Sequence, residues 1–281
     1  MSIVLRNVNF TYSKGTPFAR QSLIDLNLRI DNGEWVVIMG PTGSGKSTFL
    51  QHLNGLLHPD SGEVLLDDIN IHSSPANLRK ARQEVGFVFQ YPEHQLFTGS
   101  VFAEVAYGPE NFGLTGTDVV QRVKISLETV GLDFSRYKER SPYELSGGEK
   151  RRVALAGVLA QAPRYIALDE PTAGLDWAGK KRLIETVKKL NVEHGITVIW
   201  VTHEVSEVAS LAGRLLVINR GRLVLDGALR DTLHNPLMNE LGLDVPVPVR
   251  VAAGLQIRGR QVTGQPVTVK EIRQEIINIK R

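Results

Sequence analysis

Apolar and polar positions alternate in the N-terminal part of the chain. The alternation over Ile3–Tyr12, and again over Ser22–Ile30, is typical of strands with one buried face, and Asp31–Gly33 then predicts a turn. All residues of Trp35–Met39 are apolar, which predicts a central strand buried on both faces. A glycine-rich segment follows this strand, and a helix is expected from Lys46 to about Asn54.

The middle of the chain combines short apolar runs with helical spacing. The runs Val85–Gln90, Tyr165–Leu168 and Ile196–Val201 are typical of buried strands, and Ala178–His194 predicts a helix between the last two. Strands that alternate with helices indicate a largely parallel sheet covered on both faces, which is an α/β fold. Residues 91–161 are mainly helical and interrupt the alternation, so we expect an inserted subdomain there.

The pattern changes again near the C-terminus. The prolines of Asp244–Val249 are expected to break regular structure, and Val269–Lys280 has the spacing of a short closing helix. We therefore predict an α/β domain over residues 1–230 and a C-terminal extension over residues 231–281.

Composition narrows the function only slightly. The 281 residues are 42% hydrophobic and 22% charged with a net charge of +3, which fits a globular protein and selects no partner. The absence of cysteine excludes disulfides, thiolate catalysis and cysteine-bound metals. No apolar run approaches the roughly 18–20 residues of a membrane span, and no signal peptide is visible, so a membrane would have to be reached through a partner.

The glycine-rich segment fits the pattern G-x-x-x-x-G-K-[ST] between a strand and a helix. Glycines let successive backbone N–H groups converge on an anion, and a helix start adds unpaired N–H groups and its dipole. Lys46 would supply a cation to the β- and γ-phosphates, and the Ser47 hydroxyl would bind Mg²⁺. The predicted nucleotide-binding residues are Gly40, Pro41, Thr42, Gly43, Ser44, Gly45, Lys46, Ser47 and Thr48.

Two acidic residues, Asp169 and Glu170, follow the apolar run Tyr165–Leu168. Open α/β sheets bind ligands at the carboxyl ends of their strands, so both carboxylates are expected beside the phosphates. Asp169 would then hold magnesium, and Glu170 would orient or deprotonate the attacking water. A helix cap is the alternative for such a pair, and the phosphate-binding pattern argues against it.

A third motif consists of Leu145, Ser146, Gly147, Gly148 and Glu149. Ser146 and Glu149 have the spacing of a helix capping box. A cap does not need two glycines, whereas close approach of the backbone to a ligand does, and an exposed helix start attracts anions. The motif resembles the signature of ABC ATPases, in which it meets the γ-phosphate of ATP bound to another subunit.

Four further positions resemble motifs of the same family, in the same order. Gln90 is similar to the glutamine of the Q-loop, Asp176 to the aspartate of the D-loop, and His203 to the switch histidine. Tyr12 resembles the aromatic residue that stacks on adenine, although such a tyrosine can also be part of the core. The resemblance covers residues 2–230.

The resemblance implies a P-loop NTPase core of ABC ATPase type, with an antiparallel β subdomain and an inserted α-helical subdomain. It implies ATP and Mg²⁺ as cofactors and two domains paired head to tail, so that the signature acts in trans. The catalytic residues it implies are Lys46, Gln90, Glu170 and His203. The magnesium ligands it implies are Ser47, Gln90 and Asp169.

The segment after Gln90 resembles the extended Q-loop of energy-coupling factor (ECF) transporter ATPases, which energise uptake of vitamins or of cobalt and nickel. Two ATPases of this group dock on a transmembrane coupling subunit, which joins a membrane substrate-binding subunit. The resemblance implies a heterodimer rather than a homodimer, a peripheral position at the cytoplasmic face of the cell membrane, and no nucleic-acid partner. The docking residues it implies are Tyr91, Pro92, Glu93, His94, Gln95, Leu96 and Phe97.

Alternatives remain open for both the docking segment and the function. Leu96 and Phe97 could simply pack an ordinary loop. The chain could serve an ordinary ABC importer or exporter, or act as a soluble ABC ATPase on nucleic acid or ribosomes, although it has one cassette and no heptad insertion. The sequence does not identify the transported solute.

The chain departs from the family pattern at two positions. Glu149 stands where glutamine is typical and brings a carboxylate near the phosphates, which would weaken binding in trans unless Lys150, Arg151 or Arg152 offsets its charge. Trp177 replaces the usual proline after Asp176. We also expect residues 231–281 to help hold the ATPase pair together.

Overall fold

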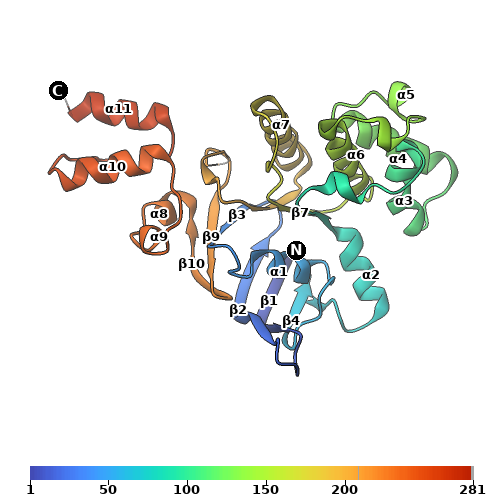
Figure 1. Cartoon of the computed structure of the whole chain (residues 1–281), viewed down its shortest axis with the longest axis horizontal. Helices are drawn as coiled ribbons and strands as arrows, with labels where there is room; N and C mark the ends of the chain where they lie inside the picture. The colour runs from blue at the N-terminus through green and yellow to red at the C-terminus, as the bar shows by residue number, and fades with distance from the viewer. Residues whose placement is uncertain (208, 280–281) are drawn as a thin grey trace.

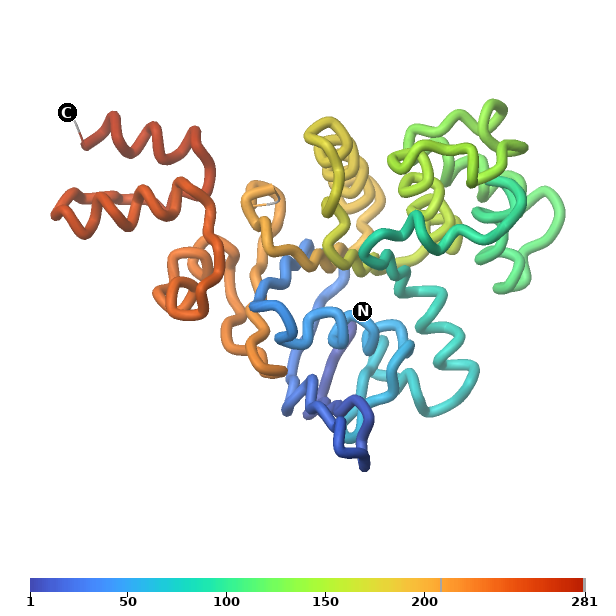
Figure 2. Tube along the Cα trace, viewed as in Figure 1, coloured from blue at the N-terminus to red at the C-terminus, as the bar shows by residue number. Residues whose placement is uncertain are grey.

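The computed structural model describes residues 1–207 and 209–279. Two sheets form the centre of the molecule, and a helical subdomain and a group of C-terminal helices lie at opposite ends of it (Figure 1). The C-terminal helices project away from the sheets, whereas the N-terminus lies near the centre (Figure 2). Lys280, the last residue of the predicted closing helix, lies outside the described residues.

The larger sheet has six strands in the order β10-β9-β3-β8-β7-β6. All neighbouring strands are parallel except β9 and β10, which are antiparallel. Every residue of β3, β7 and β8 is buried, because the sheet is covered on both faces. The predicted parallel sheet is therefore confirmed. Its strands are β3 (Trp35–Met39), β6 (Val85–Val88), β7 (Tyr165–Asp169), β8 (Thr197–Val201), β9 (Arg214–Asn219) and β10 (Arg222–Ala228).

The smaller sheet is antiparallel and has four strands in the order β2-β1-β4-β5. Buried and exposed residues alternate along parts of β1 and β2, as the sequence pattern predicts for strands with one buried face. This sheet is the antiparallel β subdomain. Its strands are β1 (Ser2–Tyr12), β2 (Arg20–Asp31), β4 (Ser61–Leu66) and β5 (Ile69–Asn70).

The strand predictions were wrong or incomplete at two places. The run predicted over Val85–Gln90 ends as a strand at Val88, where pairing with Leu168 of β7 is the last rung of the ladder. Gln90 consequently lies in the loop beyond β6 instead of ending a strand. The hairpin of β9 and β10 was not predicted, although it extends the parallel sheet past β3.

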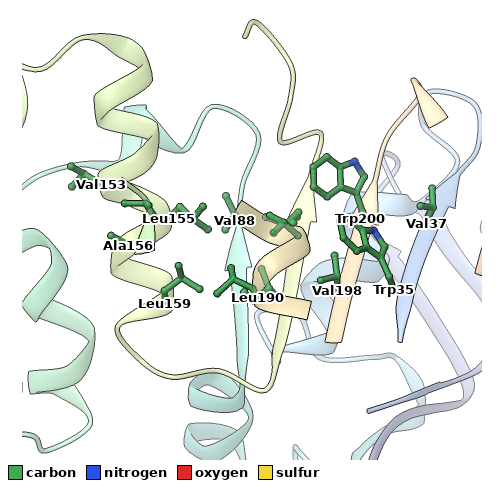
Figure 3. Packing of buried hydrophobic residues seen from close by; sticks show 14 of the residues in the cluster. Trp35, Val37, Val88, Val153, Leu155, Ala156, Leu159, Leu190, Val198 and Trp200 are labelled. Atoms are coloured by element: carbon green, nitrogen blue, oxygen red, sulfur yellow. The ribbon is translucent and has the colours of Figure 1, made fainter. Parts of the chain in front are cut away.

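Two hydrophobic clusters cover the two faces of the parallel sheet. Val37 of β3 faces one cluster with helices α6 and α7, whereas Val36 and Ile38 face the other with the antiparallel sheet and α1. In the first cluster the rings of Trp35 and Trp200 lie with centroids 6.0 Å apart beside Val198 of β8 (Figure 3). Burial of this apolar surface fixes the carboxyl ends of the strands, from which the functional loops start.

Helices α1 and α7 follow strands, as predicted, and the inserted subdomain is helical. Its segments include two short 3₁₀ helices, η1 (Pro92–Gln95) and η2 (Pro142–Glu144). Among the residues that the structure describes, no helix has both the length and the apolar character that a membrane span requires. The helices up to His194 are α1 (Lys46–Leu53), α2 (Pro75–Glu84), α3 (Val101–Asn111), α4 (Gly116–Thr129), α5 (Phe134–Tyr137), α6 (Gly147–Leu159) and α7 (Trp177–His194).

The C-terminal extension is more helical than predicted. Helix α10 begins at Val247, inside the segment that was expected to break regular structure. Pro246 is its N-cap and Pro248 lies in its first turn, where a missing N–H costs nothing, so these prolines start a helix instead of interrupting one. The helices that follow β10 are α8 (Leu229–Leu233), which begins two residues before the predicted extension, α9 (Leu237–Glu240), α10 (Val247–Ile257) and α11 (Val269–Ile279).

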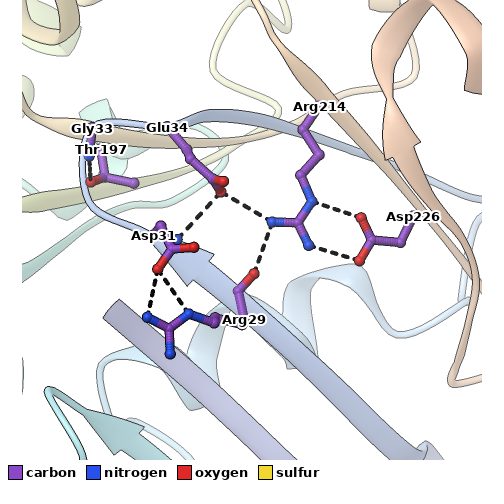
Figure 4. Close-up of polar contacts among 7 residues, drawn as sticks. All are labelled: Arg29, Asp31, Gly33, Glu34, Thr197, Arg214 and Asp226. Atoms are coloured by element: carbon purple, nitrogen blue, oxygen red, sulfur yellow. Dashed lines mark hydrogen bonds and ion pairs between the residues drawn. The ribbon is translucent and has the colours of Figure 1, made fainter. Parts of the chain in front are cut away.

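A cluster of ion pairs joins the two sheets at the end of β3 opposite the glycine-rich loop (Figure 4). Arg214 of β9 forms a two-bond ion pair with Asp226 of β10, both bonds being 2.7 Å long. The same guanidinium donates to a carboxylate oxygen of Glu34 at 3.1 Å and to the carbonyl oxygen of Arg29 at 2.8 Å. Arg214 thereby fixes the hairpin that the sequence pattern missed.

Candidate functional site

The glycine-rich loop lies between β3 and α1, and its backbone geometry requires glycine. Gly45 has φ +107°, and a Cβ there would lie 2.5 Å from the carbonyl oxygen of Ser22. A Cβ on Gly40 would overlap the carbonyl oxygen of Ile218. Because Gly45 is the N-cap of α1 and provides no side-chain cap, the first-turn N–H groups of this helix are left for a ligand.

Lys46 lies at the start of α1 and folds back over the loop. Its Nζ donates hydrogen bonds to the carbonyl oxygens of Gly40 at 2.7 Å and Pro41 at 3.0 Å. Burial lowers the pKa of Lys46, and the nearby carboxylates of Glu170 and Asp169 oppose this effect. The ammonium is thus partly desolvated and held close to two acids, as an anion-binding cation would be.

An open hollow lies beside the loop, and residues outside the glycine-rich motif also line it. Tyr12, whose hydroxyl is 3.1 Å from Thr48 Oγ1, lies at its edge and is 39% exposed. Arg20 and Ser22 also line it, and sequence analysis missed both. The antiparallel pairing of β1 with β2 places Arg20 directly opposite Tyr12, so recognition of a hairpin would have found it. The hollow is lined by Tyr12, Arg20, Ser22, Gly43, Ser44, Gly45, Lys46, Ser47 and Thr48.

The two predicted carboxylates lie at the end of β7. Burial raises the pKa of Asp169, whereas a hydrogen bond from Ser47 lowers it. Glu170 has a left-handed backbone with φ +47°, and its Oε2 lies 2.9 Å from His203 Nδ1. That hydrogen bond raises the pKa of His203, whose side chain is 69% exposed. The structure thus brings together Lys46, Ser47, Asp169, Glu170 and His203.

Gln90 lies outside this group of contacting residues. It is exposed in the loop after β6, and it does not line the hollow beside Tyr12. The magnesium contact of Gln90 stays a prediction.

The Ser146–Glu149 segment forms the predicted capping box at the start of α6. Ser146 Oγ accepts the N–H of Glu149 at 3.3 Å, and Glu149 Oε2 accepts the N–H of Ser146 at 2.9 Å. Leu145 is buried, whereas Ser146, Gly147 and Gly148 are exposed. The bare helix start is consequently accessible from outside the molecule.

The charged form of Glu149 is stabilised by a residue that sequence analysis missed. The Tyr137 hydroxyl donates to Glu149 Oε1 at 2.6 Å, and mainly through this bond it lowers the pKa of Glu149 to about 2. Two of the basic residues named as possible counter-charges have other partners. Arg151 pairs with Glu93, and Arg152 donates to the carbonyl oxygens of Gly148 and Gly131.

Asp176 and Trp177 lie where the chain turns from the Glu170 loop into α7. Asp176 caps this helix by accepting the N–H of Gly179 at 2.7 Å. Trp177 is 77% exposed, and Lys181 lies over its ring. The hollow that contains Ser146 and Gly148 also borders Leu175 and Gly179, and it shares no residue with the hollow beside Tyr12.

The segment Tyr91–Phe97 borders a groove between η1, α3 and α6. Phe97 is 60% exposed and packs edge-to-face on Tyr107, which is 51% exposed, with ring centroids 5.0 Å apart. Glu104 closes the loop by accepting the backbone N–H groups of Phe97 and Thr98. Tyr107 and Glu104 are groove residues that sequence analysis missed. Of the predicted docking residues, Pro92, Gln95, Leu96 and Phe97 line the groove.

The other three docking residues point elsewhere. Glu93 turns inward to Arg151 and does not line this groove. Tyr91 and His94 are exposed and stack with ring centroids 5.8 Å apart, outside the lining of the groove.

Comparison with known proteins agrees with this geometry. Residues 23–173 match the ABC transporter family. The chain is 42% identical to the energy-coupling factor transporter ATP-binding protein EcfA2 of Clostridium perfringens, with 100% of this chain and 99% of that protein aligned. It is 47% identical to the EcfA2 of Symbiobacterium thermophilum over 96% of this chain and 94% of that protein.

Solved structures give the same picture. The structure of cbiO1 from Clostridium perfringens, part of the ABC transporter complex cbiONQ, is similar with a TM-score of 0.74 and 34% identity over 90% of this chain and 98% of that one. An ATP-binding cassette solved as a dimer in a post-hydrolysis state with ADP and Pi has a TM-score of 0.72 and 34% identity, over 81% of this chain and 98% of that one.

Proposed function

The chain belongs to the ABC transporter family and, within it, to the energy-coupling factor ATP-binding proteins, and from this membership we propose that it energises an importer of vitamins or of cobalt or nickel ions. Its activity is ATP hydrolysis coupled to transport. The observation that carries the proposal is the combination, in one chain, of a phosphate-binding loop with a groove bordered by Gln95, Leu96 and Phe97.

ATP binds at the hollow beside the glycine-rich loop. We assign the phosphates to the loop N–H groups and Lys46, and the adenine to the exposed ring of Tyr12. The Ser47 hydroxyl and the Asp169 carboxylate are adjacent hard oxygen donors, a set that fits Mg²⁺. Gln90 would be a third ligand. When bound, Mg²⁺ would supply charge for the phosphate oxygens.

Glu170 and His203 would complete the hydrolytic centre. The carboxylate of Glu170 can accept a proton from water, and His203 holds that carboxylate through its Nδ1 at 2.9 Å. The imidazole is 69% exposed, and its Nε2, which lies 3.9 Å from Glu204 Oε1, would contact the γ-phosphate. Catalysis of this kind consists of positioning and charge stabilisation, because the phosphoryl group needs little covalent help.

A second ATPase subunit would complete each ATP site. The exposed start of α6 at Ser146, Gly147 and Gly148 lies in a hollow separate from that of the glycine-rich loop, so one chain offers two half-sites. Asp176 and Trp177 are exposed beside the hollow at Ser146 and Gly148. We propose head-to-tail pairing, with a different ABC ATPase rather than a second copy as the partner.

The groove beside η1 would receive the transmembrane coupling subunit. Exposed Phe97 and Tyr107 together with half-buried Leu96 present an apolar surface of the kind that packs on a partner helix. Through that subunit the chain would lie at the cytoplasmic face of the cell membrane and would serve a separate membrane substrate-binding subunit.

The C-terminal extension would strengthen the ATPase pair. Its last two helices keep large apolar side chains in solvent, with Ile257 86% exposed and Val269 73% exposed. Burial of such side chains against the second ATPase would add apolar contacts outside the nucleotide sites.

Co-expression tests the proposal. The chain, its proposed partner ATPase and the membrane subunits are expressed together and purified through a tag on the coupling subunit, and ATPase activity and solute uptake are measured in vesicles. We expect the chain to co-purify and to support ATP-dependent uptake. An active ATPase that pairs only with the membrane domains of an ordinary importer or exporter would contradict the ECF assignment.

A further inference from the structure

Arg151 of α6 connects three segments that are distant in the sequence. Its side chain is only 9% exposed, and its Nε and Nη2 donate to the two carboxylate oxygens of Glu93 at 3.0 and 2.8 Å. Its Nη1 donates to the carbonyl oxygens of Pro171 at 3.3 Å and Ala173 at 2.7 Å. One buried guanidinium therefore joins η1, the helix of the signature motif and the turn that follows Glu170.

The contact with Glu93 depends on the shape of arginine. A guanidinium can form two parallel bonds with a carboxylate and still donate from its third nitrogen, whereas a lysine ammonium cannot. Burial alone would raise the pKa of Glu93, but the hydrogen bonds from Arg151 lower it, so the carboxylate stays charged. Removal of either partner would leave a buried charge without its counter-charge.

The contact with the turn fixes the backbone beside the proposed base. Glu170 has φ +47°, and the N–H of Ala173 donates to its carbonyl oxygen at 3.1 Å. A non-glycine residue keeps this left-handed conformation only when its surroundings hold it. Arg151 holds the turn through two carbonyl oxygens, so displacement of the guanidinium would displace the backbone that carries Glu170.

We propose that Arg151 is a positioning residue that couples the groove beside η1 to the catalytic turn. When a subunit occupies the groove and η1 shifts, Glu93 moves with η1 and draws Arg151 with it. Arg151 in turn shifts the carbonyl oxygens of Pro171 and Ala173. This inference rests on the proposed function, because the occupant of the groove is the transmembrane coupling subunit. Neither Glu93 nor Arg151 lines the hollow beside the glycine-rich loop, whereas Arg151 borders the separate hollow at Ser146 and Gly148. Glu93 borders neither hollow, so a change at Glu93 should act on turnover and leave nucleotide affinity unchanged.

Two substitutions separate the two halves of this connection. Glu93→Gln removes the negative charge and one of the two hydrogen bonds from Arg151, which weakens the link to η1, and it leaves Arg151 its carbonyl contacts. It should lower kcat of the complete complex about tenfold, a change of about 1.4 kcal/mol, while KM for ATP stays unchanged. The ATPase pair without membrane subunits should lose less than about twofold in kcat. Arg151→Lys keeps the positive charge but cannot pair with both carboxylate oxygens of Glu93 and hold the two carbonyl oxygens of the turn as well, so it should lower kcat about tenfold in both preparations.

Two further variants serve as controls. Glu128→Gln on α4 removes one carboxylate charge from an exposed position of the same subdomain, and it should match the wild type in both preparations. Glu93→Asp keeps the charge but shortens its reach, and it should lower kcat of the complex about threefold. This variant tests the coupling even where Glu93→Gln folds poorly.

Three results would overturn the coupling role. If Glu93→Gln lowers kcat equally in the pair and in the complex, the Glu93–Arg151 contact is a static support. If the complex with Glu93→Gln keeps the wild-type kcat, the contact plays no part in turnover. Loss of the coupling subunit on purification would make Glu93 a docking contact. A wild-type pair that the membrane subunits neither bind nor stimulate would instead refute the proposed function, and Arg151→Lys in the pair would still test the link to the turn.

Discussion

Replacement of Tyr137 with phenylalanine removes the hydrogen bond that holds the unusual glutamate of the signature motif. Tyr137 is buried, and its hydroxyl lies 2.6 Å from Glu149 Oε1. A hydrogen bond to a charged group contributes ~1.5–3 kcal/mol. Because Glu149 is partly exposed and water can replace the phenol, we expect a loss of about 1 kcal/mol. For a chain of this size that corresponds to a fall in Tm of about 2–4 °C.

The pH dependence of the free energy of unfolding tests the Tyr137–Glu149 hydrogen bond in a second, independent way. The pKa of Glu149 is about 2, below its ordinary value of 4.5, chiefly because of the Tyr137 hydrogen bond. The folded protein therefore binds this proton at lower pH than the unfolded chain does. The stabilisation is fully present above about pH 4.5 and is lost as the pH falls toward about 2. Tyr137→Phe should raise this pKa and reduce the loss of stability in acid.

Urea unfolding of the wild type and the variant at about pH 7 and about pH 4 measures both effects. Tyr143→Phe is the matched control, because Tyr143 is 68% exposed and also precedes α6, the helix that begins at the signature motif. An equal loss of stability in the two variants, or an unchanged acid dependence in Tyr137→Phe, would refute the role given to the hydrogen bond.

Four other outcomes are expected. Lys46→Ala should weaken ATP binding at least about tenfold in calorimetry, since a charge-assisted contact with the phosphates is lost, and an unchanged affinity would contradict its place in the site. Glu170→Gln should bind ATP normally, lose about 100-fold in kcat and accumulate as a closed pair in gel filtration, whereas near-normal turnover would exclude it as the base. Phe97→Asp should abolish co-purification with the coupling subunit while ATP affinity stays unchanged, and normal co-purification would count against the groove. The pKa of His72 is about 4, below its ordinary value of 6.5, because burial and the neighbouring His58 disfavour the charged ring, so its contribution to stability is present above about pH 6.5 and lost as the pH falls toward about 4. His72→Gln should remove that part of the acid dependence of urea unfolding, and an unaltered dependence would assign it to another group.

The sequence was most informative where a residue type has a single physical reason to be present. Gly45 has a backbone conformation that other residues avoid and no room for a Cβ, so its position in the motif already predicted the loop. The apolar run Trp35–Met39 could be placed because a strand buried on both faces needs no polar position. The capping box at Ser146 depends on local spacing, and its prediction was confirmed.

Contacts between distant segments could not be predicted in this way. The partner of Glu149 is Tyr137, which belongs to another helix, and neighbouring basic residues were the nearest candidates in the sequence. The inward direction of Glu93 depends on Arg151, a residue of a different helix. The prolines of α10 break a helix in its interior but fit its first turn, and only the position of the helix start decides between these effects.

The separation of the two hollows has a consequence for a transporter built from two unlike ATPases. Each chain would place its loop in one ATP sandwich and its serine–glycine helix start in the other, so Glu149 would face only the nucleotide held by the partner. The two sandwiches would then differ chemically, and a substitution in this chain would disable one or the other according to the hollow it alters. A loop-defective and a signature-defective copy of this chain would be distinguishable by which nucleotide remains unhydrolysed after a single closure.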